Sequence, residues 1–139
     1  MKTLPTSDKS LLIRTDFSDE AAWSDVCARA QAVSNEGFQA CIECVSDPAY
    51  DGVSVAQLLA LAARGGDRTF IFIADQTTFA SQERPVLVVD VRTEPGRMFR
   101  VTPQAMWCVE NNLSIANMDY AEFADNADAD GIFRGFPST

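Results

Sequence analysis

"TFIFIAD", residues 69–75, indicates the fold class, because five consecutive apolar residues stand between a threonine and an aspartate. A strand with one face in solvent alternates apolar and polar residues, so this unbroken run predicts a strand that is covered on both faces. The run "PVLVVDV", residues 85–91, predicts a second strand of the same kind. Buried strands of this type are typical of α/β proteins, in which helices cover the sheet.

Between the N-terminus and these runs, predicted strands alternate with predicted helices. Residues 11–15 and 40–45 predict strands. A helix is predicted between them, with Ser18 as its N-cap and an apolar face that continues to Val33. A further helix is predicted ahead of residue 69, where Ser54 and Gln57 have the spacing of a capping box.

Toward the C-terminus, "EPG" at residues 94–96 predicts a tight turn, so residues 85–91 and 98–101 are expected to form an antiparallel hairpin. Two helices follow, one capped by Thr102 and one beginning at Asp119. The whole order predicts a single α/β domain over residues 1–139, with three layers, a mostly parallel sheet and an antiparallel edge hairpin. Residues 1–9 are expected to be a flexible N-terminus.

Composition excludes several classes of function. The net charge is −9 and the pI is near 4.3, which disfavours nucleic acid as a partner. The absence of histidine excludes Ser-His-Asp and Cys-His mechanisms within the chain, and the only lysines are Lys2 and Lys9. No apolar run is long enough to span a membrane, and the N-terminus lacks a signal-peptide core. We therefore expect a cytoplasmic protein, with neither membrane partner nor cofactor, that is not an enzyme.

Acidic residues are concentrated near the C-terminus. Between residues 104 and 139, one base accompanies six acids: Glu110, Asp119, Glu122, Asp125, Asp128 and Asp130. A solvated face explains this pattern, and so does a surface complementary to a basic protein partner.

Three aspartates could form a metal site. Asp16 and Asp75 each follow a predicted strand, and Asp90 lies near the end of another. If these strands were parallel, the carboxylates would meet at the carboxyl edge of the sheet, where they could hold Mg²⁺, with Arg14 or Arg92 contacting an anion. The alternative is that each aspartate caps the helix or turn that follows it.

The segment "ENNLSIAN", residues 110–117, contains three asparagines between two helices and is flanked by aromatic residues. Asparagines in such a connection commonly satisfy backbone groups. They could instead form a recognition patch. The candidate binding residues are Trp107, Glu110, Asn111, Asn112, Asn117, Asp119 and Tyr120.

Two further patterns resemble metal or redox motifs. Cys41 and Cys44 have CxxC spacing, but they lie in a predicted strand, so buried, reduced thiols are expected for all four cysteines. "NADADGIFRGFP", residues 126–137, resembles the start of a calcium loop, yet it has Asn126 at position 1 and Pro137 at position 12. We expect no calcium site there, and Phe133 and Phe136 are expected to anchor the C-terminus.

The chain resembles a bacterial family known only as a domain of unknown function. The stretches that carry the resemblance are "LLIRTDFSDEAAW" (11–23), "DPAYDG" (47–52), "FIFIAD" (70–75), "VENNLSIANMDYAEFA" (109–124) and "DGIFRGF" (130–136). The resemblance implies no activity, cofactor or catalytic residue. The last two stretches are also similar to those of small bacterial immunity-type proteins. We therefore expect a non-enzymatic, protein-binding module of immunity or antitoxin type. The alternative is a magnesium-dependent enzyme or small-ligand binder that uses the three aspartates.

Overall fold

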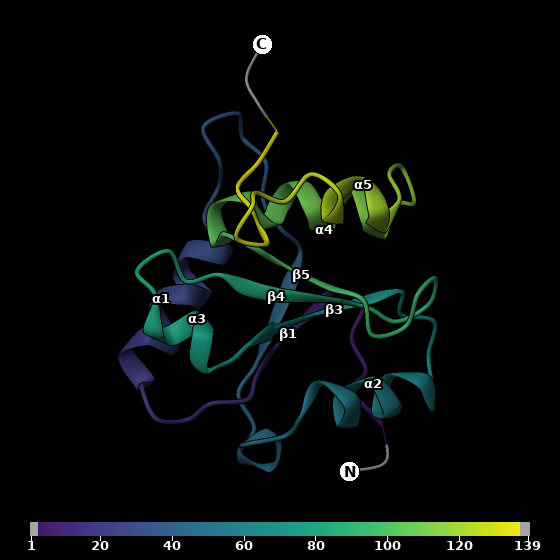
Figure 1. The fold of residues 1–139 in the computed structure, drawn as a ribbon. Coiled ribbons are helices and arrows are strands. Elements are labelled where there is room, and N and C mark those ends of the chain that lie inside the picture. Colours follow the sequence, from purple (N-terminus) through teal and green to yellow (C-terminus); the bar gives the residue numbers. More distant parts are fainter. Residues whose placement is uncertain (1–2, 137–139) are drawn as a thin grey trace.

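A computed structural model describes residues 3–136, which form a six-stranded mixed sheet with helices (Figure 1). The strands are β1 (Ser10–Arg14), β2 (Ile42–Val45), β3 (Phe70–Ala74), β4 (Val86–Asp90), β5 (Met98–Val101) and β6 (Ile132–Phe133). The α-helices are α1 (Glu20–Ala30), α2 (Val55–Ala63), α3 (Gln76–Ala80), α4 (Met106–Ser114) and α5 (Tyr120–Ala124), with short 3-10 helices at Pro48–Tyr50 and Pro103–Ala105. The α/β class predicted from the sequence is confirmed.

The sheet is mixed: three of its five strand pairs are parallel, and the two antiparallel pairs both involve β4. In the order β2-β1-β3-β4-β5-β6, β1 pairs parallel with β2 and β3, but β4 is antiparallel to both of its neighbours. Parallel neighbours need a crossover of about a dozen residues or more. The connection over residues 75–85 contains only the short α3, so the chain turns back. The β4–β5 hairpin is not at the edge either, because β6 pairs parallel with β5.

Alternate strand residues enter two hydrophobic clusters. Leu12 and Phe72 belong to a cluster with residues of α1, α4 and α5, whereas Ile13 and Ile73 pack with residues of α2. In Figure 1, α2 lies on one side of the sheet and α4 and α5 lie on the other. Every residue of β3 and β4 is buried, as their unbroken apolar sequences predicted.

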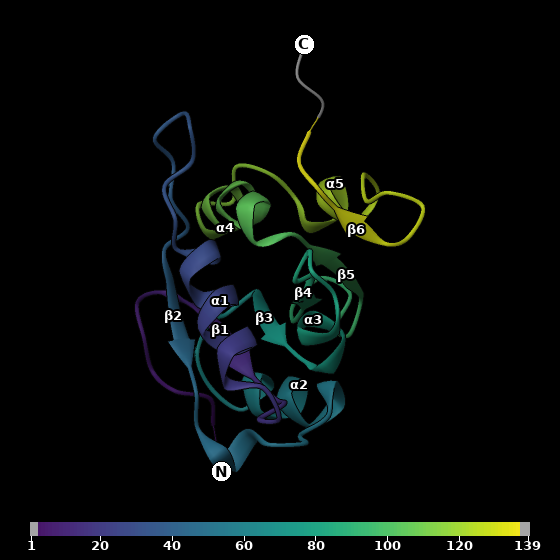
Figure 2. The same ribbon diagram turned by 90° about the vertical axis from the view of Figure 1, so that its left-hand side faces the viewer.

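Helix α1 begins one residue later and ends earlier than expected. Its N-cap is Asp19, whose carboxylate accepts the N–H of Ala22, whereas the predicted cap, Ser18, donates to the carboxylate of Asp16. The helix ends at Ala30, and Val33 is exposed. Residues 31–41 form a loop that reaches to the end of the molecule where α4 lies (Figure 2). The predicted capping box of Ser54 and Gln57 is present at α2.

Both ends of the described chain pack against the sheet. Near the N-terminus, Leu4 is buried in the cluster beside α2, and the Arg68 guanidinium donates to the carbonyls of Ser7 and Lys9. Met1 and Lys2 lie outside the described residues. At the other end Phe133 is fully buried, and Phe136 packs on it with a ring-centroid separation of 5.0 Å. The phenylalanine anchors predicted from the sequence are therefore present.

Within residues 3–136, every helix is too short or too polar to cross a lipid bilayer.

Candidate functional site

The three aspartates of the hypothetical metal site do not converge. Asp16 and Asp75 lie at the carboxyl ends of β1 and β3. Asp90, at the end of the antiparallel β4, is in register with Phe70 at the start of β3, so it lies at the opposite edge of the sheet. Within residues 3–136 no group of three acidic or cysteine side chains is arranged to hold a metal ion. The expectation failed because it assumed that β4 was parallel to β3.

Each of these carboxylates organises local backbone instead. Asp16 accepts two hydrogen bonds from Ser18, which lower the pKa of the carboxyl group. The Asp90 carboxylate accepts backbone N–H groups from Arg92, Thr93 and Glu94 and so shapes the turn before β5. Both residues therefore cap the segment that follows them, which was the alternative interpretation of the sequence.

Asp75 is held by an arginine. Its carboxylate accepts hydrogen bonds of 2.9 and 2.8 Å from Arg100 and caps α3 through the N–H of Thr78. Burial raises the pKa of Asp75, but the hydrogen bonds and charge of Arg100, together with Thr78, lower it more, and the net direction is down. A carboxylate with these partners is already neutralised and is a poor metal ligand.

Arg14 is the most deeply buried charged side chain at this edge, with 2% exposure. Its Nε donates to the carbonyl of Asp16, and its Nη1 donates to Glu20 and Ser46. The guanidinium lies 4.2 Å from the ring centroid of Phe17, a cation–π arrangement. Nη2 is buried and has no hydrogen-bond partner among the described residues. Sequence reasoning named Arg14 as an anion contact, but its burial could not be seen without the register of the strands.

Arg92, the other arginine named from the sequence, is exposed and donates to the carbonyl of Asp67. It lies near Asp90 and therefore at the other edge from Arg14.

Among the residues proposed as a recognition patch, Trp107 has an aromatic partner. The indole stacks on Phe38 with a centroid separation of 4.8 Å and an interplanar angle of 11°. Phe38 is 50% exposed and belongs to the 31–41 loop. This stack connects the loop to α4, and it presents an aromatic edge to solvent.

Glu110 is buried and holds together three parts of the chain. Its carboxylate accepts hydrogen bonds from the Cys41 N–H at 2.7 Å, the Ser10 hydroxyl at 3.0 Å and the Ser114 hydroxyl. An open groove of about 880 Å³ runs past it, between residues 3–10 and the end of α4. Since the carboxylate is satisfied from within the protein, it offers little to a ligand in that groove.

The asparagines mainly satisfy main-chain carbonyl groups. Asn111 donates to the carbonyls of Gln39 and Trp107, and Asn112 donates to that of Cys108. Asn117 donates to the side chain of Asn112 across the turn after α4. These contacts agree with the interpretation that the asparagines satisfy backbone groups, because the backbone of an irregular connection must find hydrogen-bond partners.

Asp119 and Tyr120 begin α5. Asp119 is the exposed N-cap, without a side-chain cap hydrogen bond. The Tyr120 hydroxyl is buried and lies 2.9 Å from the Val88 carbonyl oxygen and 2.7 Å from that of Arg97. Burial, with a smaller contribution from Asp90, raises the pKa of this tyrosine.

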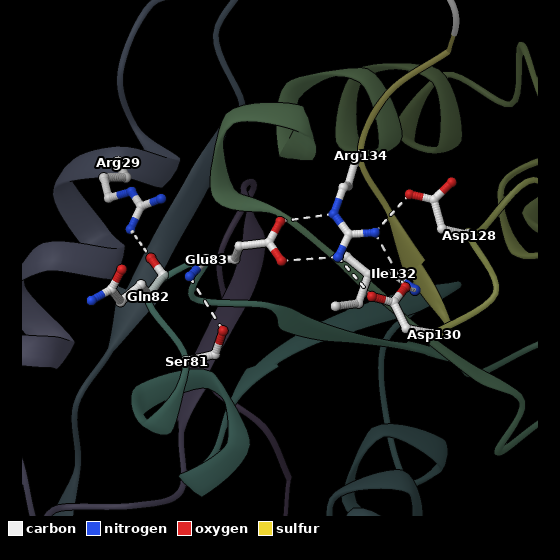
Figure 3. Close-up of polar contacts among 8 residues, drawn as sticks. All are labelled: Arg29, Ser81, Gln82, Glu83, Asp128, Asp130, Ile132 and Arg134. Atoms are coloured by element: carbon white, nitrogen blue, oxygen red, sulfur yellow. Dashed lines mark hydrogen bonds and ion pairs between the residues drawn. The ribbon is translucent and has the colours of Figure 1, made fainter.

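The calcium-like loop is closed by an arginine. Arg134 forms ion pairs with Asp128, Asp130 and Glu83 at 2.6–2.7 Å (Figure 3). Gly131 has a φ of +81° and its N–H donates to the carbonyl of Asp128, which makes a tight turn before β6. The aspartates at the calcium-like positions thus face a guanidinium. Pro137, at position 12 of the pattern, lies outside the described residues.

A second arginine extends this charged region. Arg97 pairs with Asp125 at 2.6 Å and lies 3.9 Å from Glu94. We call the exposed carboxylates of this region the acidic edge; they are Glu83, Glu94, Asp119, Glu122, Asp125, Asp128 and Asp130. Seven carboxylates against the two guanidinium groups leave a net charge of −5. The sequence predicted an acidic C-terminal third, but it did not predict that Glu83 and Glu94, which lie outside that third, would belong to the acidic edge.

The cysteines are all free thiols. Cys27, Cys44 and Cys108 pack against the core, whereas Cys41 is exposed. The expectation of four buried thiols was therefore wrong for Cys41, which precedes β2 and points away from the core.

Comparison with known proteins identifies the domain family. The family model of the domain of unknown function DUF6924 matches residues 9–136. No curated protein matches the chain.

Proposed function

We propose that this chain, which belongs to the DUF6924 family of domains of unknown function, is a non-enzymatic module whose acidic edge binds a basic protein partner. The observation that carries the proposal is the excess of exposed carboxylates, since both guanidinium groups within the acidic edge are already paired with acids. A surface of one sign attracts a partner of the other sign, accelerates encounter and disfavours wrong partners.

Apolar side chains accompany the charges. Met98, 50% exposed, follows Arg97, and Phe136, 41% exposed, follows Arg134 by two residues. Protein interfaces commonly combine such anchors with a charged rim, and a few of these anchors supply most of the binding free energy. The pairing of Phe136 with the buried Phe133 gives it a rigid base, which reduces the entropy that binding would cost.

The proposed role is of the immunity or antitoxin type, in which a small protein binds and neutralises another. Four free thiols fit a reducing compartment, so the same proposal places the protein in the cytoplasm. The alternative of a magnesium-dependent enzyme or small-ligand binder has less support, because Asp90 is remote from Asp16 and Asp75 is paired with Arg100.

Charge reversal with a matched control tests the proposal. Glu94→Lys with Glu122→Lys changes the acidic edge, whereas Glu36→Lys with Asp51→Lys changes the net charge equally at exposed positions elsewhere. Each tagged protein is used to capture partners from its source cells, and bound proteins are quantified. We expect a specific basic protein with the wild type and the control pair, a large loss with the acidic-edge pair, and weaker capture at high salt.

A generic basic protein, cytochrome c, serves as a probe of non-specific attraction. If the captured protein binds no better than cytochrome c, or if both charge-reversed pairs lose it equally, net charge alone accounts for capture and the proposal fails. Phe136→Ala provides a second arm, because it should weaken specific binding without changing the attraction for cytochrome c.

A further inference from the structure

Cys27 of α1 and Cys44 of β2 lie next to each other. Cys44 is in register with Leu12 of β1, and both residues pack in the cluster that α1 covers. Cys27 packs against the same cluster and lies one helical turn after Trp23, whose ring centroid is 5.5 Å from the Arg14 guanidinium. The CxxC spacing in the sequence pairs Cys44 with Cys41, whereas the structure places Cys44 beside Cys27 and leaves Cys41 exposed.

A buried cation lies beside the pair. Arg14 follows Leu12 by two residues on β1 and Ser46 follows Cys44 by two on β2, so all four side chains are on the same face of the sheet. The 3.3 Å hydrogen bond from Arg14 Nη1 to Ser46 confirms this placement. Nη2 of Arg14 is buried and has no hydrogen-bond partner among the described residues, so the charge of the guanidinium can stabilise a negative group formed nearby.

The environment favours a single thiolate. The neighbouring thiol raises the pKa of Cys27 and lowers the pKa of Cys44, and the charge of Arg14 also acts to lower that of Cys27. The first proton therefore leaves the pair more readily than the second. The thiolate is the nucleophilic form of a cysteine.

We propose that Cys27 and Cys44 form a redox-modification site, at which a hydroperoxide oxidises the two thiols to a disulfide. The Cys44 thiolate attacks the peroxide, the O–O bond breaks, and for hydrogen peroxide the products after proton transfer are a sulfenic acid and water. The Cys27 sulfur then attacks the Cys44 sulfur, the S–O bond breaks, and a second water leaves as the S–S bond forms. In total the two thiols lose two electrons and two protons to the peroxide.

The disulfide would have a structural effect. It would join α1 to the edge strand β2 and close a loop that contains residues 31–41, including Phe38. Closing a loop restricts the unfolded chain, so the oxidised protein should melt at a higher temperature than the reduced one. The site is separate from the acidic edge, and its test is independent of the proposed partner.

The experiment maps the disulfide directly. The reduced full chain is treated with hydrogen peroxide, remaining thiols are alkylated, and peptides are analysed by mass spectrometry. We expect an intramolecular Cys27–Cys44 disulfide, with Cys41 and Cys108 alkylated. In Cys27→Ser, the sulfenic acid should persist on Cys44 and be trapped by dimedone.

Cys41→Ser and Cys108→Ser are the matched controls, and both should form the same disulfide at the wild-type rate. A disulfide through Cys41, a link between chains, or oxidation of Cys41 while the Cys27–Cys44 pair stays reduced would each overturn the proposal. The peptide map of the wild-type chain decides this without any variant, so a variant that folds poorly does not obscure the answer.

Discussion

Asp75 and Arg100 are joined by two hydrogen bonds that link the carboxyl end of β3 to β5, two strands separated in the sheet by β4. The same guanidinium also donates to the carbonyl of Pro85, ahead of β4. Both side chains are mostly buried, with exposures of 26% and 21%. This pair therefore connects the carboxyl ends of β3 and β5 with the start of β4, and it removes Asp75 from the metal chemistry that its position suggests.

Asp75→Asn should lower the free energy of unfolding at pH 7 by about 1.5–3 kcal/mol, the range for a hydrogen bond to a charged group. The pKa of Asp75 is lowered in the folded state, so its stabilisation is present above the unfolded pKa of about 3.9 and is lost as pH falls through the folded value. Urea unfolding of wild type and variant across pH should show the difference shrinking in acid. A difference that is the same at pH 7 and pH 3 contradicts this account.

Tyr120→Phe removes a hydroxyl that lies between the carbonyls of Val88 and Arg97. The Arg97 carbonyl also accepts the N–H of Asp90, so the variant loses the single hydrogen bond that the hydroxyl can donate, which should cost about 0.5–1.5 kcal/mol of stability. Burial raises the pKa of Tyr120, so the neutral phenol is the form that stabilises the fold. That stability is complete below the unfolded pKa of about 10 and is lost as pH rises through the folded value. Absorbance titration should show Tyr120 ionising only at high pH or on unfolding; titration of both tyrosines near pH 10 in the folded protein would refute this.

Glu110→Ala separates a structural from a binding role for the asparagine-rich segment. The substitution leaves the Cys41 N–H and the hydroxyls of Ser10 and Ser114 without their acceptor. We expect a loss of more than about 2 kcal/mol, with increased hydrogen exchange at Cys41. Asn117→Ala, which breaks an exposed contact, is the control and should cost much less. Near-equal, small losses for the two variants would show that Glu110 does not hold these segments together.

The sequence was most informative where structure is determined locally. Residues 70–74 and 86–90 form buried strands because nearly every residue of these runs is apolar, so neither face of either strand is polar. Ser54 and Gln57 cap α2 through contacts between residues only three positions apart. What it could not supply was non-local. The direction of β4 moved Asp90 to the opposite edge, and the register of β1 with β2 placed Cys44 on the face that α1 covers and brought Arg14 to Ser46.

The acidic edge illustrates the same limit. Six acids near the C-terminus were visible in the sequence, one of which, Glu110, is buried. Glu83 joins the acidic edge through Arg134, and Glu94 joins it through Arg97, which no spacing could indicate.

Calcium should leave the melting temperature unchanged at millimolar concentration, because Arg134 already neutralises Asp128 and Asp130. Arg134→Gln should lower the melting temperature, and the loss should be smaller at high salt, since these ion pairs are partly exposed. Scanning calorimetry with and without calcium and salt checks both statements. A calcium-dependent rise in the wild-type protein would restore the metal-site interpretation of residues 126–131.

Glu20→Gln should make the thiol pair more reactive. Glu20 is exposed, and its carboxylate pairs with Arg14 at 2.7 Å while its negative charge raises the pKa of Cys27. Removing that charge leaves the guanidinium free to stabilise a thiolate. An exposed charge pair is worth about 0.3–1 kcal/mol, so alkylation of the Cys27–Cys44 pair by iodoacetamide at neutral pH should accelerate roughly twofold to fivefold.

Glu36→Gln removes the same charge from an exposed position in the 31–41 loop and is the matched control. Mass spectrometry of each alkylated cysteine gives the separate rates, and Cys108 provides an internal reference, because burial raises the pKa of its thiol independently of Glu20. The acceleration should be confined to the Cys27–Cys44 pair and should diminish with added salt. An equal effect in both variants, or a slower reaction in Glu20→Gln, would show that Arg14 does not control the pair.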